Sequence, residues 1–538
     1  MSIGVDKYWK SWAAASVLGF LGHASAQGAA AASGQELVRS YCGGCHQEHA
    51  GKFERISDIR KTPEGWVMTL FRMRQVHGLN LGDDVRDAIV RYLADTQGLA
   101  PAESAAGRFA LERRPNVQDI DLGPEIGVMC GRCHSLARVS LQRRDEEEWR
   151  KLAHTHVGQW TSIEYSASGR DRPWWQIASG PLPAKLAALY PLSSSAWADW
   201  LSRPARDLSG SWVVVGHVPG GKDFYGTARI DRGAAGDRGA GGDFKAHYQL
   251  SDVTGFEFNG DSKAIVYTGY EWRGSAQVGD RSLREVYAVS DDGKRITGRW
   301  FDAEHDEDGG EWTAVREEGA PQILTVFPQA LRTGTTTAVT IVGIGLNGVG
   351  GGTRPALALS LGAGTTVSNV ERSALRIRAV VKVAADAAPG MREVSLGGAV
   401  GKLAVYSQID QVDVVPGYGI ARVGGGRVAP VSAQFEAIAS TRLPGGELVK
   451  LGPVTAEWIS MPFDAEAKRT GDEKFAGHFD MRGRFLPNAA GPNPAREFSG
   501  NNVGNLAVVA RAADGNRTVE GRGHLVVTVQ RWITSPIY

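Results

Sequence analysis

Two copies of one five-residue pattern hold every cysteine of the chain, CGGCH at residues 42–46 and CGRCH at residues 130–134. Two thiols separated by two residues and followed at once by a histidine form the attachment signature of c-type haem. On a helical turn the thiols reach the two vinyl groups of one porphyrin, and the adjacent imidazole lies under the iron. The pattern predicts two covalently bound haems, attached through Cys42, Cys45 and His46 and through Cys130, Cys133 and His134.

Three other uses of paired cysteines explain this pattern less well. A zinc site made from two CxxC pairs does not need a histidine directly after each pair. A thioredoxin-like redox centre has one such pair in a βαβ context, whereas here two pairs lie in helix-like stretches. Structural disulfides would leave the repeated histidine without a reason, although export would permit them.

An internal repeat suggests the sixth ligand of each iron. RKTPEGWVMTLFRM at 60–73 aligns without a gap with RRDEEEWRKLAHTH at 143–156. In both segments a residue that can bind iron stands seven positions after a tryptophan, and two helical turns place both side chains on one face. The repeat predicts Met73 and His156 as the sixth ligands. Met68 and His77 remain alternatives in the first half, and His154 remains the alternative in the second.

These ligand sets predict two haems with different potentials. Met/His ligation raises the reduction potential, so the haem at Cys42 and Cys45 is expected to be the more oxidising one. Two six-coordinate haems leave no open iron position, which favours electron transfer over haem catalysis. The haem on the His156 side is then the expected entry point for electrons, and the haem on the Met73 side the exit.

Helical elements are expected to position these ligands. Thr62 and Asp145 are plausible N-caps of the two ligand helices. Residues 27–205 are predicted to form an all-α dihaem cytochrome c domain with two halves, about 34–100 and 120–205. Ser193–Ser195 can cap the last helix of this domain.

Beyond this domain the periodicity changes from helical to alternating, which predicts a multidomain protein with an all-β remainder. Short strand-like runs with turn signals predict a lipocalin-like antiparallel β-barrel at 206–319, with a sandwich as the alternative. Residues 320–408 and 409–538 are each predicted to form an immunoglobulin-like domain. No GxSxG, Walker, HExxH or dinucleotide-binding motif occurs there, so these domains are assigned to scaffolding and partner contact, and no catalytic residue is named.

The N-terminus and the charge balance bear on location and partners. Residues 1–26 have the basic start, apolar run and small-residue exit of a secretory signal peptide. No later stretch approaches the roughly 20 apolar residues that span a bilayer. With 60 basic and 59 acidic residues, no net field favours nucleic acid or an anionic membrane. The mature protein is expected in the periplasm.

The whole mature chain resembles the large (alpha, dihaem cytochrome c) subunit of quinohaemoprotein amine dehydrogenase. The resemblance is carried by the order of the domains and by five segments, CGGCH, RKTPEGWVMTLFRMRQVHG, MCGRCH, EEEWRKLAHTHVGQW and GRDRPWW. It implies a periplasmic complex of three different subunits that oxidises primary amines to aldehydes and ammonia.

In that family, the resemblance implies, cysteine tryptophylquinone is carried by a small partner subunit, and a β-propeller subunit completes the heterotrimer. This chain would pass electrons from the quinone to an external cytochrome c or copper protein. Consistent with that role, no cysteine remains here to build the quinone. The alternative hypothesis is a free-standing dihaem carrier, or a haem-based binding module attached to a surface by its β domains. The two hypotheses differ in the number of subunits.

Overall fold

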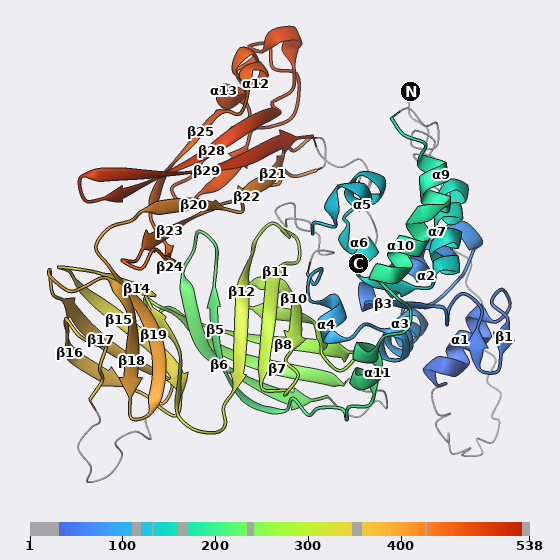
Figure 1. Cartoon of the computed structure of the whole chain (residues 1–538), viewed down its shortest axis with the longest axis horizontal. Helices are drawn as coiled ribbons and strands as arrows, with labels where there is room; N and C mark the ends of the chain where they lie inside the picture. The colour runs from blue at the N-terminus through green and yellow to red at the C-terminus, as the bar shows by residue number, and fades with distance from the viewer. Residues whose placement is uncertain are drawn as a thin grey trace, which may run out of the picture.

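The computed structural model describes residues 32–529, except 110–119, 132–133, 160–170, 234–241, 347–357 and 426–427. The predicted signal peptide at 1–26 and one predicted haem thiol, Cys133, lie outside the described residues. Four bodies follow one another along the chain, with the helical region at one side of a central barrel and the last body above it (Figure 1). None of the helices in the described ranges combines the length and the apolar character needed to cross a bilayer.

The N-terminal region is mainly helical, and local signals explain where its helices begin. Ser33 caps the first helix in a capping box with Glu36, Thr62 accepts a hydrogen bond from Gly65 N–H, and Ser194 accepts one from Trp197 N–H. Asp145 accepts the corresponding bond from Glu148 N–H. The helices are α1 (Gly34–Cys42), α2 (Pro63–His77), α3 (Asp83–Gln97), α4 (Pro101–Ser104), α5 (Gly123–Cys130), α6 (Ala137–Ser140), α7 (Glu146–Gln159), α9 (Trp174–Ser179), α10 (Pro181–Leu189) and α11 (Ser195–Leu201).

The prediction of an all-α haem domain is wrong. Two small antiparallel sheets lie among the helices, β1 (Glu48–His49) with β2 (Lys52–Phe53), and β3 (Ile59–Lys61) with β4 (Gln142–Arg144). Strands of two or three residues are too short to show an alternating pattern, and β3 and β4 pair across a long stretch of sequence. Of the described residues, 43% lie in strands and 23% in helices, so the fold is mostly β.

The predicted barrel is confirmed, because eight antiparallel strands close on themselves when β12 pairs with β5. Alternate residues of each strand point inward, and the interior is filled by aromatic side chains that include Trp212, Trp272 and Trp312. The strands are β5 (Gly210–His217), β6 (Asp223–Arg232), β7 (Asp243–Asp252), β8 (Glu257–Tyr267), β9 (Glu271–Val278), β10 (Arg281–Val289), β11 (Arg295–Asp302) and β12 (Gly309–Arg316).

The third body packs two sheets on one core. One sheet has the order β13-β15-β17-β16 and the other β14-β19-β18, and buried side chains of both sheets form a single cluster. This is the layering that a sandwich requires; the immunoglobulin-like topology of this domain stays a prediction. The strands are β13 (Gln322–Phe327), β14 (Ala330–Arg332), β15 (Thr336–Ile344), β16 (Thr365–Arg372), β17 (Arg376–Val383), β18 (Gly390–Leu396) and β19 (Ala399–Tyr406).

The C-terminal body contains three sheets, β20-β23-β24, β21-β29-β28-β25 and β22-β27-β26. Its third sheet and its helices depart from a plain two-sheet arrangement, and its immunoglobulin-like topology also stays a prediction. The elements are β20 (Gln411–Val415), β21 (Tyr418–Arg422), β22 (Ala433–Gln434), β23 (Glu436–Arg442), β24 (Leu448–Pro453), β25 (Ala456–Pro462), α12 (Ala465–Thr470), α13 (Asp472–Phe475), β26 (Gly477–Phe479), β27 (Arg484–Pro487), η1 (Glu497–Ser499), β28 (Gly504–Asp514) and β29 (Arg517–Thr528).

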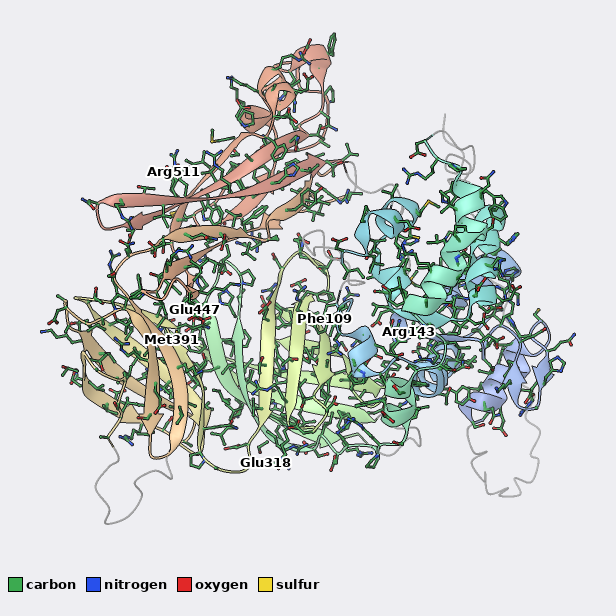
Figure 2. The ribbon with its side chains drawn as sticks, viewed as in Figure 1. Phe109, Arg143, Glu318, Met391, Glu447 and Arg511 are labelled. Carbon is green, nitrogen blue, oxygen red and sulfur yellow. The ribbon has the colours of Figure 1, made fainter. Side chains whose placement is uncertain are left out.

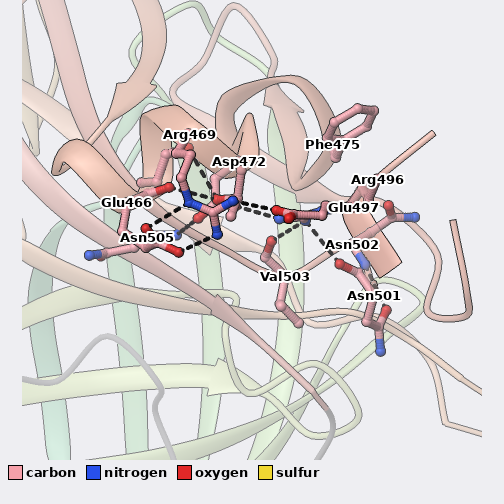
Figure 3. Close-up of polar contacts among 12 residues, drawn as sticks. Glu466, Arg469, Asp472, Phe475, Arg496, Glu497, Asn501, Asn502, Val503 and Asn505 are labelled. Carbon is pink, nitrogen blue, oxygen red and sulfur yellow. Dashed lines mark hydrogen bonds and ion pairs between the residues drawn. The ribbon is translucent and has the colours of Figure 1, made fainter. Parts of the chain in front are cut away.

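A buried ion pair holds the long connection between β27 and β28 against the helices of this body (Figure 3). Asp472 accepts a hydrogen bond from Arg496 at 2.5 Å and another from Asn505 N–H at 2.9 Å. The Arg496 guanidinium also donates to the carbonyls of Asn501 and Val503. Both charged side chains are about nine-tenths or more buried, so each depends on the other for its counter-charge.

Replacing Asp472 by alanine is expected to lower the free energy of unfolding of the C-terminal body by about 3–5 kcal/mol, because it leaves a buried guanidinium without a counter-ion. Denaturant unfolding followed by the fluorescence of Trp458 would measure the change. Glu466→Ala is the matched control, since it removes an exposed carboxylate that pairs with Arg469. An equal loss of stability in both variants would contradict the explanation.

Buried acidic groups join the haem region to the barrel. Asp95 of α3 accepts a hydrogen bond from Thr268 N–H at 2.6 Å, and Arg273 of β9 donates to Glu64 of α2 at 2.5 Å. Arg273 also lies 3.5 Å from Glu271, a side chain that is 2% exposed. Burial raises the pKa of Glu271 well above the ordinary carboxyl range, although Arg273 acts in the opposite direction.

This raised pKa predicts that the interface weakens as the pH rises. A carboxyl with a raised pKa binds more protons in the folded state, so stability falls as the pH rises above the unfolded value of about 4.3. We expect Glu271→Gln to remove part of this slope from thermal unfolding curves recorded between pH 5 and 9. A slope that is the same in the variant would contradict the assignment.

Candidate functional site: the two haem motifs

The first motif lies at the end of a helix. α1 ends at Cys42, and the N–H groups of Cys45 and His46 both bond back to the Cys42 carbonyl. His46 Nδ1 lies 2.9 Å from the Glu54 carbonyl oxygen, which can only accept, so Nδ1 carries the proton. The other ring nitrogen, Nε2, is therefore the one with a lone pair for a metal.

The two cysteines of this motif are free thiols in different environments. Cys42 is buried and Cys45 is exposed. Burial, and to a lesser extent the neighbouring Cys45, raises the pKa of the Cys42 thiol to about 11. Because these two sulfurs are not joined to each other, both are available to bond to one porphyrin.

The second motif repeats the arrangement of the first. α5 ends at Cys130, a free thiol whose pKa burial raises to about 11. Its partner Cys133 lies outside the described residues. His134 Nδ1 lies 2.9 Å from the Ser135 carbonyl oxygen, so this ring also carries its proton on Nδ1.

The structure brings His134 and His156 together. Their ring centres are 6.4 Å apart, with 41° between the ring planes. Two imidazoles on opposite sides of one metal, each bonded at about 2 Å, have ring centres about 6 Å apart. His156 Nδ1 donates to the Leu152 carbonyl at 2.7 Å, and burial lowers the pKa of His156, which favours the neutral form that binds metals. The pair thus has the spacing and the tautomer for a bis-histidine site.

His154, the alternative to His156, takes a different place. Its side chain is exposed and its ring packs edge-on against Trp175, with 4.7 Å between the ring centres. The two histidines leave α7 on different sides, as their separation of two residues requires. Among the described ring contacts, His156 is the one of the two that meets the histidine of the second haem motif.

In the first half the choice of sixth ligand still depends on the repeat. Met73 and Met68 are both half-buried on α2, and His77 is exposed near the end of that helix. Trp66, the repeat partner of Trp149, is 1% exposed, and Trp149 is 3% exposed. The two tryptophans therefore occupy equivalent buried positions, which keeps the register that pairs Met73 with His156.

The two halves meet at the β3–β4 ribbon, which sequence reasoning missed. Arg60 and Arg143 lie directly opposite each other in this pair, and Figure 2 shows Arg143 within the helical region. Both bond to Glu103 of α4, Arg60 through two contacts of 2.8 Å and Arg143 at 3.3 Å. All three side chains are less than a tenth exposed. The only signal in the sequence was the pair of basic residues that opens each repeat segment.

Four family models match the chain in succession. The first describes the haem-binding region of the quinohaemoprotein amine dehydrogenase alpha subunit and matches residues 32–197. The others describe domains II, III and IV of the same subunit and match residues 205–317, 320–407 and 412–537. No curated protein matches the sequence.

Two solved structures have a low similarity to this chain. A redesigned β-barrel, mFAP1, bound to DFHBI is 15% identical over 21% of this chain and 99% of its own, with a TM-score of 0.18. The titin domains z1z2 in complex with telethonin are 13% identical over 39% of this chain and 97% of theirs, with a TM-score of 0.14. Scores this low add nothing to the functional argument.

Proposed function

Because the chain belongs to the quinohaemoprotein amine dehydrogenase alpha-subunit family, we propose that it is the dihaem electron-transfer subunit of a periplasmic amine dehydrogenase. In this proposal it receives electrons from a quinone on a small partner subunit and delivers them to an external cytochrome c or copper protein. A β-propeller subunit completes the heterotrimer, and the oxidation of primary amines to aldehydes takes place on a partner subunit.

The observation that carries the proposal is the facing pair His134 and His156. Both imidazoles are half-buried, both have Nδ1 against a carbonyl oxygen, and their ring centres lie 6.4 Å apart, a spacing that suits two ligands of one metal. When bound, each haem stores and releases a single electron at the iron. If Met73 and His156 each bind an iron as its sixth ligand, no coordination position would stay open, which would favour electron transfer over oxygen or peroxide chemistry.

Each residue of the two motifs has a defined task in this proposal. Cys42, Cys45, Cys130 and Cys133 attach the two porphyrins through thioether bonds. His46 and His134 would each bind one iron, and the carbonyls of Glu54 and Ser135 would fix the orientation of their rings. Met73 and His156 would supply the second ligands, and the His156-side haem would be the entry point for electrons.

Purification from the native host tests the proposal. We expect a complex that contains this chain with a mass increase of two haems, together with a small subunit that stains for quinone. Adding a primary amine to the oxidised complex should bleach the quinone and reduce the c-type haems. A single chain that purifies alone would support a free-standing carrier instead. Unmodified cysteines in the exported chain would exclude both.

A further inference from the structure

The second face of the β3–β4 ribbon carries buried cations. Side chains alternate across a strand, so Lys61 and Arg144 lie on the face opposite to Arg60 and Arg143. Lys61 is 4% exposed and Arg144 is 2% exposed. Lys61 Nζ lies 5.4 Å from the ring centre of Trp66. Arg144 Cζ lies 5.8 Å from the ring centre of Trp149, the repeat partner of Trp66.

This cluster has too little negative charge around it. Among the described residues, the one buried carboxylate that pairs with this cluster is Glu148, which is shared by Arg55 at 3.5 Å, Arg144 at 3.4 Å and Lys151 at 3.0 Å. In the part of the chain that the structure describes, no carboxylate pairs with Lys61, whose Nζ donates only to the Thr69 hydroxyl at 2.7 Å.

Two further cations of the cluster also lack a paired carboxylate among the described residues. Arg72 of α2 and Arg138 of α6 are both partly buried, and within the described ranges neither forms an ion pair with a carboxylate. The buried Nε of Arg72 and the buried indole Nε1 of Trp149 have no hydrogen-bond partner in those ranges. Buried cations and donors in this state are costly unless an anion is bound beside them.

Burial changes the pKa values of two cations in the cluster. Burial lowers the pKa of Lys61 well below the ordinary lysine range, and the charge of neighbouring Arg144 lowers it further. It lowers the pKa of Arg144 to about 9, although Glu148 acts in the opposite direction. Both side chains would keep their charge more easily beside an anion.

The internal repeat relates the cations of this cluster to both halves of the haem region. Lys61 and Arg144 hold the same position in the two halves, and so do Arg55 and Arg138, so each half supplies one pair of cations. Thr69, which fixes Lys61, lies one helical turn before Met73, about 6 Å along the axis of α2. The cluster therefore lies within about one helical turn of the predicted ligand Met73.

We propose that Lys61 and Arg144, assisted by Arg55, Arg72 and Arg138, bind the propionate carboxylates of the two haems on this face of the ribbon. The inference rests on the proposed function, since it requires both haems. Each haem brings two carboxylates, which supply the negative charge that the cluster lacks. The positive charges of these side chains also stabilise the reduced state of the nearby iron, so they raise the reduction potentials of the haems.

Neutral variants of the assembled dihaem complex test the proposal. We expect Lys61→Met and Arg144→Met each to make reduction of at least one haem about tenfold less favourable, which is a potential lower by about 59 mV for a one-electron couple. Spectroelectrochemical titration resolves the two haems. Lys52→Met and Arg150→Met are the controls, because they remove an exposed and a half-exposed cation of the same halves that lie outside the cluster, and they should leave both potentials unchanged. Lys61→Arg should keep the wild-type potential, because it keeps the positive charge at this position.

A second measurement covers variants that fail to assemble. In the wild-type complex with ¹³C-labelled haem propionates, infrared spectra should show ionised carboxylates down to about pH 4, because the cations lower their pKa. Two c-type haems with potentials unchanged in both methionine variants, or propionates that titrate as free carboxyls do, would overturn the inference alone. A complex without two c-type haems would overturn the proposed function as well.

Discussion

Met73→His is expected to lower the reduction potential of the haem at Cys42 and Cys45 by on the order of 0.1–0.2 V, within the roughly 0.8 V that axial ligands span. A thioether stabilises ferrous iron, and an imidazole in its place removes that preference. The haem at Cys130 should keep its potential, because its ligands are untouched. Redox titration followed in the visible spectrum measures both haems in one sample.

Two further variants decide between the candidate ligands. Met68→His should leave both potentials near their wild-type values if Met73 is the ligand, because Met68 then does not bind the iron. The two variants are comparable, since both methionines are half-buried on α2 and differ mainly in register. His156→Met should raise the potential of the second haem, which is the reverse of the first change. A large shift in the Met68 variant with none in the Met73 variant would assign the ligand to Met68.

Glu103→Ala is expected to destabilise the N-terminal region by about 3–5 kcal/mol. The carboxylate is the shared counter-ion of Arg60 and Arg143, and its loss leaves two buried guanidinium groups facing each other across the ribbon. It also accepts a hydrogen bond from Ser194, the N-cap of α11, so the last helix of the region loses an anchor too. Thermal unfolding monitored at the haem absorbance would measure the effect, and Glu125→Ala, at an exposed ion pair, is the control.

The same carboxylate predicts how this region responds to acid. Burial alone raises the pKa of Glu103, but hydrogen bonds from Arg60 and from Ala100 N–H lower it to about 2. A lowered carboxyl pKa contributes stability that is complete above the unfolded value of about 4.3 and is lost as the pH falls toward 2. We expect Glu103→Gln to flatten the acid side of the stability profile, and an unchanged profile would contradict this role.

Features that depend on residues close together in the sequence could be predicted. The N-caps Thr62 and Asp145 are local signals, and the structure shows both of them bonded to the first turn of a helix. The barrel follows from alternation within each strand, which burial of every second residue enforces. Both kinds of pattern need only a short window of sequence.

Features made by distant residues could not be predicted in the same way. Glu103 lies far along the chain from both of its arginine partners, and nothing near it marks it as their shared counter-ion. The β3–β4 pair is three residues long, so it leaves no periodic trace, and the domain was wrongly expected to be all-α. The repeat register does align Arg60 with Arg143, and these two residues lie opposite each other in the β3–β4 pair.

Closure of the barrel determines how other polypeptides can attach to this protein. Every barrel strand has two hydrogen-bonded neighbours, so an incoming strand finds no vacant row of amides and carbonyls there. The outermost strands of the open sheets, such as β16 and β24, each keep one side without a strand neighbour in the described chain. Templated strand addition, whether useful docking or harmful fibre growth, therefore requires the open sheets, and recognition at the barrel must depend on side chains.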